Sequence, residues 1–111
     1  MAKAVFRQNG ESLDYINTGV TTIAATTVID INGKRIGVAG CEIPPGEMGS
    51  LMVKGVYSIP KKVAATVFAM GDPVEFDGDG IVAAGGSETP AGWVIENSPT
   101  LKPDVLVDIN G

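Results

Sequence analysis

The longest regular pattern of hydrophobic and polar positions runs over residues 43–61, IPPGEMGSLMVKGVYSIPK. From Leu51 to Ile59 every second residue falls on one face, in the order Leu, Val, Gly, Tyr and Ile. A period of two residues is typical of a β-strand with one buried face. Pro60 lacks the N–H that a further ladder position needs, so it ends the pattern. We therefore predict one long, central strand here, on which other strands pair.

Shorter alternating or β-branched runs predict more strands. An Asn32-Gly33 pair lies between two such runs, which is the strongest short-range signal for a type I′ hairpin. The Asp77-Gly78-Asp79-Gly80 turn separates a second pair of strand candidates. The expected strands cover residues 11–17, 26–31, 34–38, 73–77, 81–83, 91–96 and 104–109.

Residues 61–70 contain one helix candidate. Val63, Val67 and Met70 are spaced as neighbours on one face of a helix, and Gly71 can cap its end. Because Val and Thr are mediocre helix formers, extended chain is an alternative for this segment.

The chain also contains a weak internal repeat, in which a strand, a Gly-containing turn and further strands recur. The matching segments are 28–33 with 74–80, 36–38 with 91–94, and 51–56 with 105–110. Two related hairpin units that close on each other form a small barrel or sandwich with few exposed edges. We expect an all-β fold with at most one short helix, in one domain over residues 11–111. Residues 1–10 form an N-terminal arm or an edge strand.

The composition argues against several classes of function. The 111 residues carry a net charge of -5, with only eight basic side chains, which argues against nucleic acid as a partner. The sequence contains no His and a single Cys, so His-dependent catalysis, the commonest zinc ligand and an intrachain disulfide are absent. No apolar stretch approaches the roughly 20 residues of a membrane span. These features predict a soluble, cytoplasmically made protein that is not an enzyme and has no cofactor, metal or membrane partner.

Candidate chemical sites are weak. Asp77 and Asp79 resemble part of a calcium loop, but the remaining ligands and flanking helices of an EF-hand are missing. Cys41 is expected to be a buried, inert thiol on a strand. Lys54, between Val53 and Gly55, invites comparison with the modified lysine of lipoyl carrier domains. A soluble β-barrel binding or carrier module, such as a lipoyl-like carrier modified at Lys54 or a tail accessory protein, therefore remains the alternative class of function.

Two regions are candidates for contacts with other proteins. Residues 1–10 contain two cations and no acid, and we expect Lys3, Val5, Phe6 and Arg7 to form an arm that docks on a partner. Trp93 is either a core residue or an anchor for a contact between subunits, since Trp is enriched at interface hot spots.

These segments, in their order, resemble the capsid cement, or head decoration, proteins of tailed phages and prophages. The resemblance covers the start MAKAVFRQNGESLDYIN, residues 43–61, the Gly71-Asp72-Pro73-Val74 and Pro90-Ala91-Gly92 segments, and the end at Ile109-Asn110-Gly111. It implies a β-rich protein of the virion that binds the major capsid protein on the outside of the assembled head. It further implies a homotrimer that stabilises the shell against internal DNA pressure.

Overall fold

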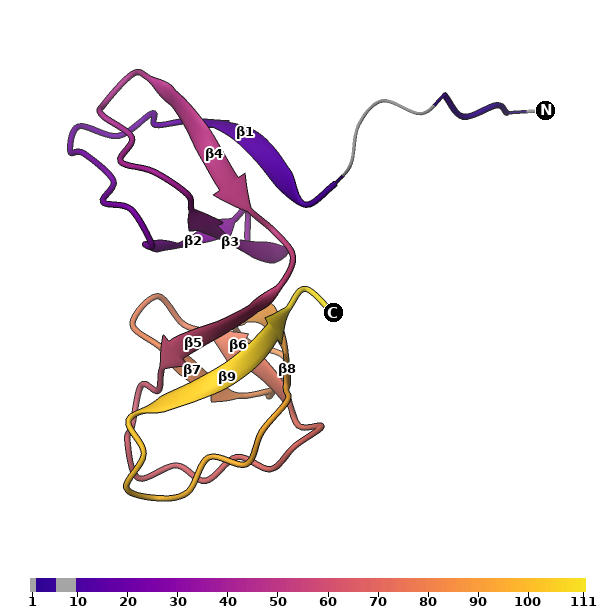
Figure 1. Cartoon of the computed structure of the whole chain (residues 1–111), viewed down its shortest axis with the longest axis vertical. Coiled ribbons are helices and arrows are strands. Elements are labelled where there is room, and N and C mark those ends of the chain that lie inside the picture. Colours follow the sequence, from indigo (N-terminus) through magenta and orange to yellow (C-terminus); the bar gives the residue numbers. More distant parts are fainter. Residues whose placement is uncertain (1, 6–9) are drawn as a thin grey trace.

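The computed structural model describes residues 2–5 and 10–111, and within these ranges all regular structure is β-strand. The nine strands form two antiparallel sheets, which make up the two lobes in Figure 1. We call residues 10–54 the first half and residues 55–111 the second half. The all-β prediction is therefore confirmed.

The first half holds a four-stranded sheet in the order β1-β4-β3-β2. Its strands are β1 (Ser12–Ile16), β2 (Val28–Ile31), β3 (Arg35–Ala39) and β4 (Met48–Met52). Asn32 and Gly33, between β2 and β3, both have positive φ (53° and 70°), as a type I′ turn requires. The predicted hairpin is confirmed at this position.

The second half holds a five-stranded sheet in the order β5-β9-β8-β6-β7. Its strands are β5 (Val56–Pro60), β6 (Pro73–Phe76), β7 (Ile81–Ala83), β8 (Thr89–Val94) and β9 (Asp104–Ile109). Lys61, directly after β5, forms a parallel bridge with Ile81 of β7, and Lys62 N donates to Ile81 O at 3.1 Å. The two ends of this sheet therefore meet, and the sheet curls back on itself.

The two halves repeat one topology. In each half the first strand pairs with the last, the last with the next-to-last, and that strand with the second one; β7 is an addition to the second half. A second shared feature is a reciprocal backbone bridge outside the strands, between Ile23 and Ile43 in one half and between Phe68 and Ser98 in the other. The repeat expected from the sequence is present in the strand order, with the same segments matched.

The prediction of one long central strand over residues 43–61 is wrong. The segment divides into β4 and β5, which belong to different sheets, and residues 53–55 form the corner between them. Gly55 has φ of 122°, a conformation that side chains with a Cβ disfavour. The alternating pattern continues through this corner because both strands have one buried face, at Leu51 and at Ile59.

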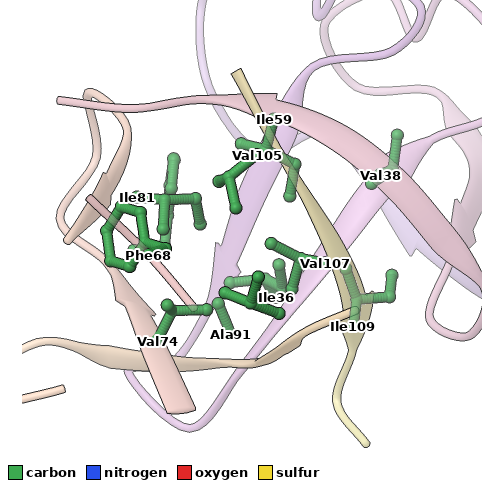
Figure 2. Close-up of a cluster of buried hydrophobic side chains, with 12 residues drawn as sticks. Ile36, Val38, Ile59, Phe68, Val74, Ile81, Ala91, Val105, Val107 and Ile109 are labelled. Atoms are coloured by element: carbon green, nitrogen blue, oxygen red, sulfur yellow. The ribbon is translucent and has the colours of Figure 1, made fainter. Parts of the chain in front are cut away.

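The strand between the two cores is β3, whose residues Ile36 to Ala39 are all buried. Ile36 and Val38 belong to the main core, together with Ile59, Val107 and other residues of the second half (Figure 2). Ala39, on the opposite face, belongs to a smaller core with Ile43 and Leu51. The two halves thus share β3, because each of its faces is covered by a different core.

Residues 61–70 are not helical in the structure, so the helix candidate is also wrong. Val63, Val67 and Met70 are exposed (57, 62 and 64%), and only Phe68 of this segment joins the main core. β-Branched residues are poor helix formers, and here the backbone of Phe68 pairs with Ser98 instead.

Candidate interaction surfaces

Of the N-terminal arm the structure describes residues 2–5 and Gly10, and residues 2–5 form no strand and have exposed side chains. Val5 is 90% exposed, as are Val20 and Leu101 (92 and 94%), so its exposure alone does not mark a contact. Phe6 and Arg7 lie outside the described residues. The structure thus presents Lys3 and Val5 to solvent, and the role of the arm stays a prediction.

Trp93 lies on β8 and is 38% exposed, so it is a surface residue of the sheet and not a member of either core. It pairs across the sheet with Pro73 of β6 and Asp108 of β9, and Asp108 pairs in turn with Val56 of β5. A Cβ on Gly111 would lie 2.8 Å from the indole Nε1, so the chain end packs beside the ring. This row, Pro73, Trp93, Asp108 and Val56, is a partly apolar surface with one aromatic anchor.

Lys54 occupies the exposed corner between β4 and β5, not the middle of a strand as expected. Carrier domains present their lysine at the tip of a hairpin, whereas the residues around Lys54 join two sheets. The position therefore gives no support to the carrier alternative.

The acidic turn after β6 is held by its own contacts. Asp77 accepts hydrogen bonds from the N–H groups of Asp79 and Gly80, and its carboxylate lies 2.6 Å from Lys62 Nζ. The Lys62 contact is the main cause that lowers the pKa of Asp77 from 3.8 to about 2. Among the described residues no group of three potential ligands is placed to hold a metal ion. These contacts are those of a turn that connects β6 and β7.

Glu75 is a buried carboxylate that the sequence analysis did not identify. It is 6% exposed and accepts hydrogen bonds from the N–H groups of Gly86 and Glu88. The bond from Gly86 is the main cause of its lowered pKa. Glu75 therefore fixes the loop that follows β7, and its role is structural.

Two buried polar side chains fix the long loops of the two halves, and the sequence pattern marked neither. Asn17, directly after β1, donates through Nδ2 to the carbonyl oxygens of Thr21 and Ile43. Lys61, directly after β5, donates through Nζ to the carbonyl oxygens of Thr66 (2.7 Å) and Pro99 (3.0 Å). Both residues are nearly fully buried. These loops are therefore preorganised surfaces.

The prediction that Cys41 is a buried residue on a strand is wrong. Cys41 is exposed and lies in the bend after β3, outside any strand. Strand β3 ends at Ala39, so the chain has already left the sheet when it reaches this residue.

A comparison with known protein families identifies the family of this chain. The profile of a family described as phage cement protein matches residues 7–109, nearly the whole chain. The chain belongs to the phage cement protein family. Membership indicates a structural role at a phage capsid, in agreement with the resemblance found in the sequence. No curated protein and no solved structure matches the chain significantly.

A membrane-crossing helix is not found in the part of the chain that the structure describes.

Proposed function

We propose that this phage cement protein binds the outer surface of the assembled head and stabilises the shell. The match to the cement family over residues 7–109 carries this proposal. The all-β body, in which β3 lies between two cores, is consistent with a rigid protein, and its preorganised loops present surfaces without large ordering costs. The protein is made in the host cytoplasm and becomes part of the virion, and its partner is the major capsid protein.

The arm makes the first shell contact in this proposal. Lys3 and Val5 are exposed and outside any strand, and Phe6 and Arg7 extend the same basic and apolar segment. An extended terminal segment can cover a large surface of its partner. Many copies on one lattice make weak individual contacts sufficient.

The subunits associate as a trimer through the surface around Trp93. An exposed Trp between Pro73 and Asp108 offers a large, rigid anchor, and such residues dominate interface energetics. The trimer fits a local three-fold position of the shell.

Deletion of residues 2–8 tests the arm. We expect lower occupancy on expanded, undecorated heads and weaker protection of those heads against heat, measured by a sedimentation assay and calorimetry. A control variant, Lys34→Ser with Leu101→Ser, loses one cation and one exposed apolar side chain from other surfaces and should bind like the unchanged protein. Equal occupancy for the deletion and the control would remove the arm from the proposal.

Trp93→Ser tests the subunit contact. Because the chain has a single Trp, its fluorescence reports directly on this surface. We expect the unchanged protein to show a concentration-dependent emission shift, and light scattering to show a trimer that Trp93→Ser converts to monomers. A Trp93→Ser variant that remains trimeric would contradict the assignment, and Leu101→Ser serves as the matched control.

A further inference from the structure

In the part of the chain that the structure describes, β1 and β2 are the edge strands of the first sheet, each paired on one side only. In the second half the strand that corresponds to β2 is β6, and its equivalent edge is covered by β7. β7 also reaches Lys61 at the end of β5, so that sheet has little free edge. The first half has no counterpart of β7, and within residues 2–5 and 10–111 no strand pairs with the outer edge of β2. Open edges are templates for an added strand.

A cleft of about 320 Å³ lies between these two edge strands, with Leu13 of β1 on one side and Ile31 of β2 on the other. Val53 adds to its apolar part, and Leu13 is 42% exposed there. The cleft is thus an opening beside the small core of the first half, where one more apolar side chain can be accommodated.

The polar part of the cleft is cationic. Arg35 and Lys54 line it, and no carboxylate does. Neither side chain forms an ion pair with any of the residues the structure describes. Asn110, the remaining polar residue, already donates to the carbonyl oxygens of Ile36 and Val53. Two uncompensated cations at one site are notable in a chain with a net charge of -5.

We propose that the free edge of β2 accepts an extended, acidic segment of the shell protein, which rests on the proposed function. Residues two positions apart in a strand point to the same face. The segment therefore places an apolar side chain beside Leu13 and Ile31, and an acidic one two positions away, against Arg35 and Lys54. The N-terminal arm of a second copy is disfavoured as the occupant, because its charged residues, Lys3 and Arg7, carry the same charge as the cleft.

A charge reversal tests this assignment. We expect Arg35→Glu with Lys54→Glu to weaken binding to undecorated heads by about ten-fold or more, since like charges then face each other across the interface. The matched control is Lys34→Glu with Lys102→Glu, which changes net charge equally at residues outside the cleft. The control should stay within about two-fold of the unchanged protein. Thermal unfolding of all variants checks that each one is folded.

Hydrogen exchange supplies the second measurement. Strand addition should protect backbone amides within residues 28–31 when the protein binds heads, as pairing removes them from water. If the unchanged protein fails to bind heads, the proposed function itself fails. If it binds, but the cleft variant binds like its control and residues 28–31 gain no protection, only this inference is overturned. A cleft variant whose oligomeric state changes in the absence of heads would assign the cleft to a second copy instead, which also overturns it.

Discussion

The two halves of this phage cement protein have the same strand order but differ in how completely their sheets are closed. In the second half β7 joins β6 to the end of β5, and twelve buried residues form the core, two of them supplied by β3. In the first half no such strand is present, and only Ala39, Ile43 and Leu51 are fully buried in the smaller core. The second half is therefore the more completely closed of the two, and the first half is the one whose sheet keeps the free edge at β2 within the described residues.

The largest expected difference between the halves is in the stability lost when a glycine is replaced by alanine. The two corresponding glycines are Gly37 on β3 and Gly92 on β8. Gly92 has φ of 137°, and a Cβ there would lie 2.0 Å from the carbonyl oxygen of Asp108. A Cβ on Gly37 would meet only side-chain atoms, the nearest being Leu51 Cδ1 at 3.1 Å. We expect Gly92→Ala to lower the free energy of unfolding by about 3 kcal/mol or more, and Gly37→Ala by about 1 kcal/mol. Urea denaturation measures both; equal losses would contradict the asymmetry.

The buried side chains that hold the loops give the next effect. Lys61→Met keeps the aliphatic stem but leaves the carbonyl oxygens of Thr66 and Pro99 without their donor, which should cost about 2–3 kcal/mol. Asn17→Ala should cost about 1–2 kcal/mol, because its loop is more open to water. Hydrogen exchange should increase mainly within residues 62–72 and 95–103 for Lys61→Met, and within 18–27 and 40–47 for Asn17→Ala. If either variant increased hydrogen exchange in the loops of both halves, the loops would not be held independently of each other. Lys34→Met, which replaces an exposed lysine, is the control.

A smaller effect is expected where the halves are joined. Asn110, with φ of 57°, uses its side chain to bond both backbone groups of Ile36 and the carbonyl oxygen of Val53. Asn110→Gly keeps the backbone conformation and removes these three bonds, so we expect a loss of about 1–2 kcal/mol in the free energy of unfolding. Asn32→Gly is the matched control, because Asn32 has a similar φ of 53° in an exposed turn. A loss no larger than that of the control would show that Asn110 does not join the halves.

The smallest effect is a dependence on pH that is confined to the second half. The folded protein holds the pKa of Asp77 at about 2, below its ordinary value of 3.8. The ionised Asp77 carboxylate therefore stabilises the folded protein fully above about pH 4, and this stabilisation is lost as the pH falls through about 2. Asp77→Asn should flatten this part of the pH profile of the melting temperature, although Glu75, whose pKa is also lowered, will keep some of it. A profile unchanged by Asp77→Asn would contradict the role of the Lys62 contact.

Local patterns in the sequence predicted most of the strands. The Asn32-Gly33 turn, the hairpin of β6 and β7, and the final strands were found because their signals lie within a few residues of each other. The repeat was also visible, since both halves need similar strand and turn residues in the same order. The failed helix at residues 61–70 shows the limit of such patterns: its periodicity was real, but pairing of Phe68 with Ser98 decided the conformation.

The candidate surfaces were only partly visible in the sequence. Val5 is exposed and Trp93 is a partly exposed residue outside both cores, and the contacts expected of both stay predictions. Lys61 and the cleft at Arg35 could not be predicted. A lysine is normally exposed, and its burial here depends on carbonyl groups from two separate loops. The cleft depends on which strands remain unpaired.

The segment over residues 43–61 shows most clearly what each level decides. The sequence by itself determined that much of the segment is extended and that alternate side chains, such as Leu51 and Ile59, face the core, because these properties depend on the period of the local pattern. Only the tertiary structure decided that the segment is two strands, in two sheets, with a corner at Gly55. It also decided that β3, and not this segment, lies between the cores. The physical reason is that strand pairing, and burial on both faces of a strand, depend on residues distant in the chain. The local hydrophobic pattern contains no information about those residues.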